Sequence, residues 1–378
     1  MKKKNIVIIV TLLVLVLSAG IGVLTINQGN YEEMTGWQRT AYAILNRDKI
    51  LESKYIGEVS DYTWSADEEY KLENTSIVMK EAGEDFVIMN ITDLHMSDYR
   101  QDALLAIRAF DSIRLMVKKH QPDMITLSGD IFWEDSTIYS VHRLTEFMDS
   151  LEIPWAPVFG NHDYEGNCDM NYLADIMMSG EYCLMQKGDP SMGVGNYIVN
   201  ICEETNGQKE VAHSVILMDT HNSKPYENQV EWYKWATKGV NALMGEDVNS
   251  TIVMHIAFDA YQYAYETAWD AQNNCWKEGF QAFGEKREEE CFERDEEGNP
   301  VDSGIFAAIK EVGTTKNTIC GHDHINTYSI NYEGVQWTYS LRLGLGAYFD
   351  VDCQGVTLLT LHEEGTSSVE HDYRYDDK

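Results

Sequence analysis

Short apolar runs alternate with amphipathic segments along the chain from residue 84 onward. Six of these runs have the length and the bounding residues of buried strands: residues 86–91, 124–127, 155–159, 214–218, 251–254 and 318–320. Residues 102–119 repeat apolar side chains at three- and four-residue spacing, which predicts an amphipathic helix that ends before Pro122. A second helix is predicted over residues 137–151. Strands that alternate with helices predict an α/β fold.

The first 27 residues carry a different hydrophobic pattern. Lysines at positions 2–4 precede an uncharged and almost wholly apolar run from residue 6 to residue 26. A membrane-spanning helix needs about 20 apolar residues, so this run is long enough to cross. Positive charge on its N-terminal side predicts that this end stays in the cytoplasm and that the remaining chain is exported. Residues 1–27 are therefore expected to be an uncleaved membrane anchor, or a signal sequence cut near residues 18–20 that would leave a secreted protein.

The remaining chain divides into regions of different composition. Residues 28–83 are polar and aromatic and are expected to form a stalk or N-terminal extension, with an edge strand at residues 76–80. Residues 84–362 hold the alternating pattern of the main domain, and residues 363–378 are expected to be an acidic tail. Within the domain, residues 257–303 break the rhythm with clustered Tyr and Trp followed by runs of Glu. This insertion is expected to be a solvated helical excursion or a cap over a binding site.

The charge balance excludes one class of function. The chain has 29 Lys and Arg against 62 Asp and Glu, a formal net charge of −33. Nucleic-acid backbones are bound through clustered positive charge, so general nucleic-acid binding is excluded. A phosphate-bearing substrate would need local positive charge at its site, for example from a metal ion.

The cysteines give no motif. Seven cysteines are scattered without the paired spacing of a structural zinc site. Export would permit disulfides, and the odd number would leave at least one thiol free or paired between chains. Cys320 is expected to be a small buried residue at the end of a strand.

Side chains that can bind metals follow five of the predicted strands. In α/β sheets ligands bind at the carboxyl ends of the strands, where loops from several strands converge. The residues at these ends are carboxylates, imidazoles and one amide: Asp93, His95, Asp130, Asn161, His162, Asp163, His255, His322, Asp323 and His324. Asp93 and His95 are two residues apart, so an extended backbone would direct both to one side, and the same holds for His322 and His324. Packing alone hardly explains this accumulation.

The types and the number of these side chains point to metal ions. Imidazole together with carboxylate suits Zn, Fe, Mn or Co, and the absence of thiolate argues against a structural zinc or iron–sulfur site. Seven ligands drawn from these ten side chains would exceed the need of one ion. Two ions about 3.5–4 Å apart that share one carboxylate would use all seven and would form a clamp for in-line displacement at phosphorus.

The order of these residues resembles a known family. Asp93-Leu-His95, Gly129-Asp130, Gly160-Asn-His-Asp163, His255 and Gly321-His-Asp-His324 are similar to the five-block signature of the calcineurin-like metallophosphoesterases. The resemblance covers residues 84–362 and implies that family's four-layer αββα sandwich with two mixed β-sheets. Residues 153–163 are similar to the purple-acid-phosphatase-related branch that includes the Dcr2-like phosphatases of yeast.

The resemblance also implies a role for each matching residue. The implied metal ligands are Asp93, His95 and His324 for one ion, Asn161, His255 and His322 for the other, and Asp130 as the bridge. The ions would be Fe, Mn or Zn, and a hydroxide held between them would attack phosphorus. His162 would stabilise the developing charge or protonate the leaving oxygen as a general acid.

Three further residues have weaker expected roles. Asp163 would either orient His162 or accept backbone amides as a cap. Asp323, between two ligands, would point away from the metals and support them from behind. Arg342, in a glycine-bearing loop, would contact a phosphate oxygen or carry only a surface charge. Purple acid phosphatases place a metal-bound Tyr where this chain has Trp133, so no purple colour is expected.

The sequence thus predicts a hydrolase of phosphoric esters that acts outside the cytoplasm, most simply a phosphomonoesterase for a small phosphorylated substrate. Two alternatives stay open. One is a phosphodiesterase that acts on a nucleotide or a lipid head group. The other is a non-catalytic surface binding module that keeps the fold. Degenerate members of the family usually lose ligands, and none of the seven is missing here.

Overall fold

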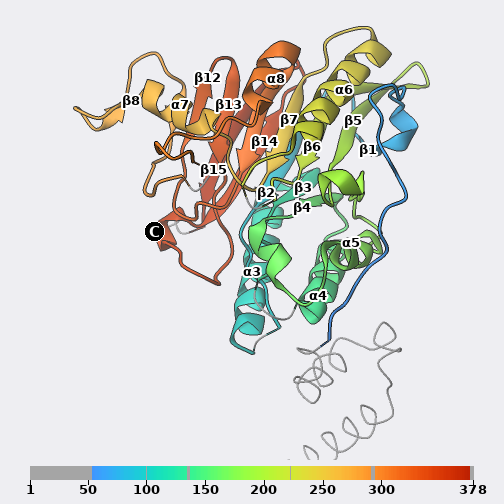
Figure 1. Ribbon diagram of the computed structural model, residues 1–378, viewed down its shortest axis with the longest axis vertical. Coiled ribbons are helices and arrows are strands. Elements are labelled where there is room, and N and C mark those ends of the chain that lie inside the picture. Colours follow the sequence, from blue (N-terminus) through green and yellow to red (C-terminus); the bar gives the residue numbers. More distant parts are fainter. Residues whose placement is uncertain (1–52, 99, 134–136, 222, 291–293, 375–378) are drawn as a thin grey trace, which may run out of the picture.

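The computed structural model describes residues 53–374, apart from residues 99, 134–136, 222 and 291–293 (Figure 1). The expected anchor and the first part of the expected stalk lie outside these described residues. Among the helices that are described, none is both long enough and apolar enough to cross a membrane.

The smaller of the two main sheets has five strands in the order β15-β14-β2-β3-β4. Strands β2, β3 and β4 are parallel to one another, whereas β14 runs antiparallel to both β2 and β15. The five strands are β2 (Phe86–Ile91), β3 (Met124–Ser128), β4 (Trp155–Val158), β14 (Gly355–Leu361) and β15 (Ser367–Tyr373). The parallel strands β3 and β4 are buried along their whole length, which explains their nearly continuous apolar sequence.

The larger sheet has eight strands in the order β1-β5-β6-β7-β11-β13-β12-β10. Its centre is parallel, through the pairs β6–β7, β7–β11 and β11–β13. The strands are β1 (Ser76–Met79), β5 (Tyr197–Thr205), β6 (Gln208–Met218), β7 (Ser250–Met254), β10 (Ala282–Phe283), β11 (Thr315–Cys320), β12 (Ser329–Tyr332) and β13 (Val335–Tyr339). A separate two-stranded hairpin is formed by β8 (Trp269–Asp270) and β9 (Cys275–Trp276).

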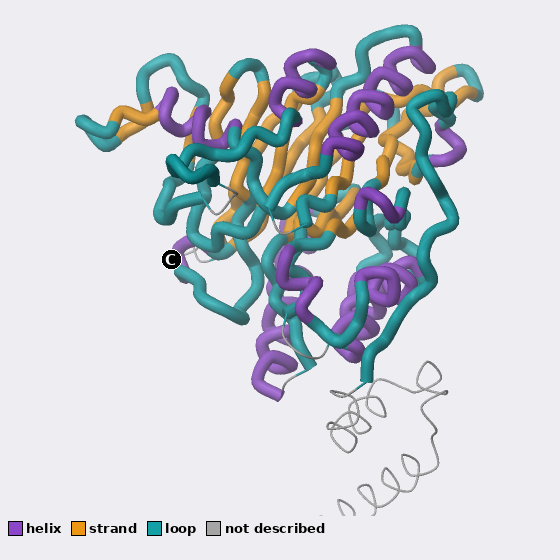
Figure 2. Tube along the Cα trace, in the orientation of Figure 1, coloured by secondary structure: helices purple, strands orange, loops and turns teal. Residues whose placement is uncertain are grey.

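Helices cover the outer faces of both sheets, so the molecule has four layers (Figures 1 and 2). The smaller sheet carries α3 (Arg100–His120), α4 (Ile138–Asp149) and α5 (Met170–Met178). The larger sheet carries α6 (Glu227–Met244), α7 (Ala260–Ala268) and α8 (Ile305–Val312). Short 3-10 helices connect these elements: η2 (Leu72–Asn74), η3 (Asn161–Glu165), η4 (Pro190–Met192) and η5 (Val351–Cys353).

Two hydrophobic clusters hold the layers together. One cluster joins α3, α4 and α5 to the smaller sheet and continues between the sheets through Val199 and Leu217 of the larger sheet. The other lies beneath α6, α7 and α8 and includes Tyr261 and Trp337. The two sheets therefore pack face to face, and the carboxyl ends of their parallel strands meet along a common edge.

The predicted elements are present with small shifts. All six predicted strands and both predicted helices exist, and the edge strand expected at residues 76–80 is β1. Strand β6 begins at Gln208, earlier than predicted, because its first residues are largely exposed and carry no apolar signal. Cys320 is buried at the end of β11, as expected. Six cysteines lie in the described part of the chain, and all six are free thiols.

Part of the segment expected to be an acidic tail is a strand instead. Residues 367–373 form β15, which pairs with β14 along its whole length. Asp372 on this strand contacts Lys119 and His120 at the end of α3, with His120 Nε2 2.5 Å from its carboxylate. The strand is only half buried, so its sequence has no strong apolar run and is similar to that of a solvent-exposed acidic tail.

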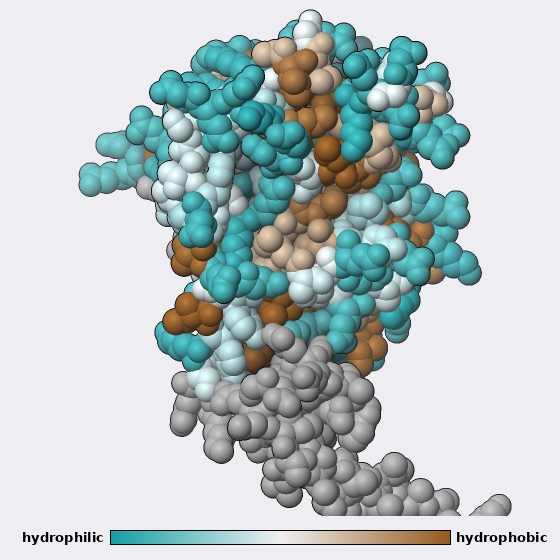
Figure 3. Space-filling model, turned by 90° about the vertical axis from the view of Figure 1, so that its right-hand side faces the viewer, coloured by the Kyte–Doolittle hydropathy of each residue, from teal (hydrophilic) through white to brown (hydrophobic). Residues whose placement is uncertain are grey.

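Two segments extend beyond the layers. In the insertion, α7 leads into the β8–β9 hairpin, which projects from one end of the molecule, and β10 then joins β12 at the edge of the larger sheet (Figure 1). At the other end, residues 53–75 run along the molecule to β1. On this side hydrophobic residues form a band between hydrophilic ones (Figure 3).

Candidate metal centre

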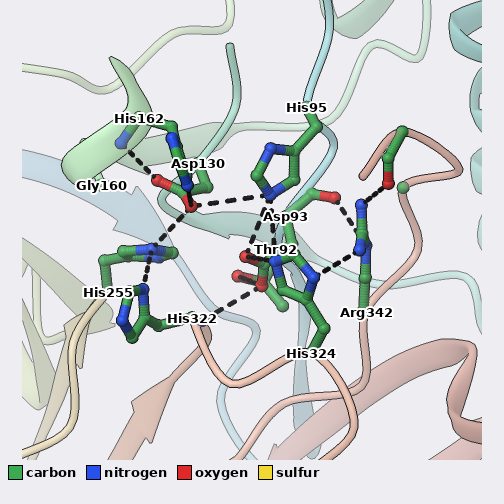
Figure 4. A network of polar contacts seen from close by, with 12 residues as sticks. Thr92, Asp93, His95, Asp130, Gly160, His162, His255, His322, His324 and Arg342 are labelled. Atoms are coloured by element: carbon green, nitrogen blue, oxygen red, sulfur yellow. Dashed lines mark hydrogen bonds and ion pairs between the residues drawn. The ribbon is translucent and has the colours of Figure 1, made fainter. Parts of the chain in front are cut away.

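The candidate ligands come from both sheets and meet where the strand ends converge. Three strands of the smaller sheet, β2, β3 and β4, lead into Asp93 and His95, into Asp130, and into Asn161 and His162. Two strands of the larger sheet, β7 and β11, lead into His255, His322 and His324. Figure 4 shows the side chains of six of these residues pointing toward one another across the edge: Asp93, His95, Asp130, His255, His322 and His324.

Four side chains form what we call the first ligand group: Asp93, His95, Asp130 and His324. The Nε2 atoms of His95 and His324 lie 3.1 Å apart. Asp93 Oδ1 lies 3.3 Å from His324 Nε2 and 3.6 Å from His95 Nε2. One atom from each residue falls within 4.8 Å of all the others, and all four residues are buried, so the group can enclose one metal ion.

The second ligand group consists of Asp130, His255 and His322. His255 Nε2 lies 3.1 Å from Asp130 Oδ2 and 3.3 Å from His322 Nδ1. The same oxygen, Asp130 Oδ2, lies 3.6 Å from His95 Nε2 of the first group. Asp130 is therefore the residue that the two groups share, which is the arrangement that a bridged pair of ions requires.

Three buried oxygen atoms of the site fit metal ions because they accept no hydrogen bond from the described residues, although two of them lie beside histidine rings. Asp93 Oδ1, Asp130 Oδ2 and Asn161 Oδ1 are buried and accept no hydrogen bond within the described chain. A buried acceptor without a partner costs about 1–3 kcal/mol, and more when it is charged. Bound cations would compensate all three. Asn161 follows β4 and directly precedes His162, whose backbone N–H donates to Asp130 Oδ1.

The two carboxylates are held in the ionised form. Burial acts to raise the pKa of Asp93, but the neighbouring His324 outweighs burial and keeps the pKa well below its usual range. Burial and His255 oppose each other in the same way at Asp130, and its pKa is also lowered. The site thus buries negative charge that needs a counter-charge.

The imidazoles divide into neutral and charged rings. Burial lowers the pKa of His95, and burial together with His255 lowers the pKa of His322 to about 4. Burial also acts to lower the pKa of His255, but Asp130 outweighs it and raises the pKa to about 10. Neutral imidazole is the form that binds metal, and the proton on His255 stands where a cation would balance Asp130.

The backbone at the ligands is not extended, although the sequence spacing predicts an extended backbone at Asp93 and His95. Asp93, His95, Asp130 and His322 all have positive φ, between 47° and 73°. Left-handed backbone costs a non-glycine residue of order 1–3 kcal/mol and concentrates at functional sites. The side chains of Asp93 and His95 still converge, because two successive reversals of the chain replace the alternation of a strand.

Glycines bring the backbone close to the second group. Gly129 has a φ of +88°, and a Cβ there would lie 2.5 Å from the ring of His255. A Cβ on Gly160 would lie 2.4 Å from Asp130 Oδ1 and 2.6 Å from His255. Any side chain at either position would therefore displace a candidate ligand.

Backbone carbonyl groups orient two of the imidazoles. His255 Nδ1 donates to the carbonyl oxygen of Ser128 at 2.8 Å. His324 Nδ1 lies 2.8 Å from the carbonyl oxygen of Tyr348 and 2.6 Å from Arg342 Nη1. In both rings Nδ1 is engaged in this way and Nε2 faces the ligand group, which is how proteins usually orient a metal-binding imidazole.

His162 belongs to neither group, and 32% of its side chain is accessible. Its backbone N–H donates to Asp130 Oδ1 at 2.9 Å, and its Nε2 lies 4.0 Å from Asp130 Oδ2. Trp133 lies against it, with ring centroids 6.1 Å apart, and against His95 at 5.3 Å. His162 is thus placed beside the shared carboxylate with access to solvent.

The three residues with weaker expected roles contact backbone and ligand residues. Asp163 accepts the N–H groups of Phe132 and Gly160, at 2.6 and 2.7 Å, which is the capping role. Asp323 accepts from the hydroxyl of Tyr339 at 2.6 Å and is buried.

Arg342 is only 1% exposed. Its Nη1 lies 2.6 Å from His324 Nδ1, and its other contacts are the carbonyl oxygens of Asp93, Gly346 and Tyr348. The expectation that Arg342 carries only a surface charge is therefore wrong, because the guanidinium is buried behind His324, and its contact with a phosphate oxygen stays a prediction.

Other residues around the ligands were not found from the sequence. Glu165 Oε2 lies 2.9 Å from His162 Nδ1, and the three-residue spacing on a 3-10 turn is a signal that could have found it. Tyr348 covers the ring of His324, with centroids 4.2 Å apart, and its hydroxyl donates to Glu288 at 2.9 Å. No local pattern connects Tyr348 or Glu288 to His324.

Several known proteins are similar to this chain in sequence. Probable inactive purple acid phosphatase 28 of Arabidopsis thaliana is 23% identical over 62% of this chain and 62% of its own length. Phosphatase DCR2 of Saccharomyces cerevisiae is 24% identical over 40% of this chain and 29% of its own. The chain thus spans less than two thirds of the length of these curated relatives.

A solved dimetal phosphatase from Danio rerio shares 12% identity and a TM-score of 0.46, over 76% of this chain and 96% of that one. The family model for calcineurin-like phosphoesterases matches residues 86–326, which hold every candidate ligand. The chain belongs to the calcineurin-like phosphoesterase family.

Proposed function

We propose that this protein hydrolyses phosphoric esters with the help of two metal ions, one in each ligand group, and that its main substrates are small phosphomonoesters. The single observation that carries the proposal is Asp130 Oδ2, a buried oxygen that accepts no hydrogen bond from the described residues and lies between His95 of the first group, at 3.6 Å, and His255 of the second, at 3.1 Å. In the proposed assignment Asn161 completes the second group. The ion identity would be Fe, Mn or Zn.

The charge of the substrate explains why the metals are needed. A phosphoric ester is an anion, and the buried carboxylates Asp93 and Asp130 would repel it. Two bound ions would supply Lewis-acid stabilisation of the phosphoryl oxygens and would offset this repulsion. The protein itself holds the carboxylates ionised and fixes the imidazole orientations through Ser128 and Tyr348.

His162 is the residue best placed to move a proton. Its Nδ1 faces Glu165, so its Nε2 is the atom directed toward Asp130 and the space in front of the ligands. A protonated Nε2 there would donate to the leaving oxygen of the ester, while the Glu165 contact would hold the ring in that orientation. Trp133 limits the rotation of the same ring from the side.

A second candidate function is a non-catalytic binding module. The relatives named probable inactive purple acid phosphatases favour it, since their names deny them activity. Against it stands the complete ligand set of this chain. A phosphodiesterase uses the same centre, so the ligand geometry does not separate it from a monoesterase.

The test is hydrolysis by the full chain loaded with Mn²⁺, Fe or Zn²⁺ in separate samples. The substrates are p-nitrophenyl phosphate and bis(p-nitrophenyl) phosphate, with the variant Asp130→Asn as the control for contaminating activity. Faster release from the monoester, absent in Asp130→Asn, is the expected result. Faster release from the diester would favour the phosphodiesterase, and no release from either by a protein that holds two ions would favour the binding module.

We also propose that the protein is anchored in a membrane and faces outside the cytoplasm, or is secreted if the leader is cut. The lysines and the apolar run of residues 2–26 support this proposal. Protease treatment of intact cells tests it, because an exported domain would be digested and a cytoplasmic one would be protected.

A further inference from the structure

The insertion returns to the metal centre after its projecting hairpin. Residues 285–290, which we call the clamp segment, run alongside residues 325–328, directly after the ligands His322 and His324. Thr327 N–H donates to the carbonyl oxygen of Glu285 at 2.8 Å, and Glu285 N–H donates to Thr327 Oγ1 at 3.0 Å. The insertion is therefore attached to the loop that supplies both imidazoles of β11.

Asn326 joins the two segments more closely. Its side-chain oxygen accepts the backbone N–H groups of Arg287 and Glu288, at 2.9 and 3.0 Å. Its side-chain nitrogen donates to the carbonyl oxygen of Glu288 at 3.1 Å. Because Asn326 is 1% exposed, these bonds are shielded from water.

Glu288 extends the contact to the ligand itself. One carboxylate oxygen accepts the N–H of Ile325, the residue after His324, at 2.9 Å. The other oxygen accepts the hydroxyl of Tyr348 at 2.9 Å. Tyr348 in turn lies against the ring of His324, and its backbone carbonyl oxygen lies 2.8 Å from His324 Nδ1. Glu288 thus holds His324 in two ways. It accepts the backbone N–H of the residue that follows His324, and it accepts the hydroxyl of Tyr348, whose ring lies against His324.

We propose that Glu288 is a positioning residue for the first metal ion, and that the insertion acts as a clamp on His324 rather than only as a cap or a solvated excursion. This inference rests on the proposed dinuclear centre. Partners behind a ligating histidine typically contribute a factor of about 10–100 in metal affinity. The second group lacks a contact of this kind in the described chain, because His255 is oriented by Ser128 of the smaller sheet.

The clamp segment offers a matched control. Glu289 is the neighbouring residue with the same charge, but its side chain is 86% exposed and reaches Lys286 at 3.3 Å. Replacing Glu288 or Glu289 by Ala removes the same charge from the same segment. A difference between the two variants therefore reports the contacts of Glu288 and not the loss of one negative charge near the cations.

The experiment is a Mn²⁺ titration of the full chain, with bound ions counted by elemental analysis after equilibrium dialysis. Wild type and Glu289→Ala should bind two ions with matching affinities. In Glu288→Ala the Kd of one ion should rise about 10- to 100-fold, and the Kd of the other should stay within about 2-fold. Glu288→Gln, which keeps the shape and one acceptor, should fall between wild type and Glu288→Ala.

Folding and function are separated by two further readings. Thermal unfolding of the metal-free variants shows whether the fold is retained, and Tyr348→Phe, which removes only the hydroxyl, should raise the same Kd without loss of fold. Equal affinities in Glu288→Ala and Glu289→Ala would overturn the clamp while the dinuclear centre stands. A wild-type chain that binds fewer than two ions would overturn the centre and the clamp together.

Discussion

The two ligand groups share Asp130 but are supported in different ways. The second group is held by the backbone of the strand ends: the carbonyl group of Ser128 orients His255, and Gly129 and Gly160 let the chain approach both His255 and Asp130. The first group is held by side chains from distant segments. Arg342, Tyr348 and Glu288 all lie behind His324 or its loop.

This difference shows where each half of the metal centre can be altered, where a half means one ligand group together with the residues that support it. Support from strand–turn geometry is part of the fold, so a change there is expected to disturb both the backbone and the ligand. Support from the insertion is added to the fold, so the affinity of the first ion can change while the sheets stay intact. The predictions below separate the two halves, and they run from the largest expected effect to the smallest.

Asp130→Asn should break both halves at once. The amide has no charge to share between the groups, so both ions should be lost and activity should fall by about 10³-fold or more, equivalent to several kcal/mol of transition-state stabilisation. Elemental analysis and turnover of the purified variant check this. Two retained ions would show that Asp130 is not the shared ligand.

His162→Ala should leave both halves intact. His162 lies outside the two groups, so we expect two bound ions and a turnover lower by about 10²–10³-fold, in the range of a lost general acid. The measurement is kcat together with metal content on the same sample. Loss of an ion in this variant would contradict the assignment of His162.

Gly129→Ala should affect only the second half. The new Cβ would lie 2.5 Å from the ring of His255, and the φ of +88° would be strained. Gly207→Ala is the control, because Gly207 has a φ of +80° with nothing within 4 Å of a Cβ. Gly207→Ala should lose about 1–2 kcal/mol of unfolding free energy from backbone strain alone, and Gly129→Ala should lose more, because its Cβ also displaces a buried ring. Only Gly129→Ala should bind one ion less tightly, as measured by Mn²⁺ titration.

His213, which is buried away from both ligand groups, should affect the stability of the fold alone. Burial lowers the pKa of His213 to about 3, against about 6.5 when unfolded. The unfolded chain then binds the extra proton, so stability is full above pH 6.5 and falls as the pH drops toward 3. At pH 5 the loss is about 2 kcal/mol.

His213→Gln should remove that part of the acid sensitivity. Urea unfolding at pH 7 and pH 5 with a chelator present measures the change, since chelation removes any contribution of metal release. The variant should lose about 2 kcal/mol less than wild type between the two pH values. An equal loss in both proteins would mean that His213 is protonated in the folded state.

The half of the site built from strand ends could be predicted from sequence, and the half built from distant support could not. Strand β3 followed by Gly129 and Asp130, or β7 followed by His255, leaves a local signal of apolar run, turn and ligand. Glu288 and Tyr348 reach His324 only because the chain folds back, and no spacing in the sequence encodes that contact. The left-handed backbone at Asp93 and His95 was missed because spacing alone suggests a continued strand.

The same distinction holds for the fold. Strands that are almost wholly buried, such as β2 and β3, were predicted within a residue because most of their positions are apolar. Strand β15 was read as a tail because only one of its faces is covered and its pairing with β14 is fixed by tertiary contacts.

The most direct test of the shared dinuclear centre is a crystal of the full chain loaded with Mn²⁺, with the ions located by their anomalous scattering. The account predicts two peaks, one among Asp93, His95 and His324 and one among Asn161, His255 and His322, both in contact with Asp130. A single peak, or two peaks of which only one contacts Asp130, would contradict it.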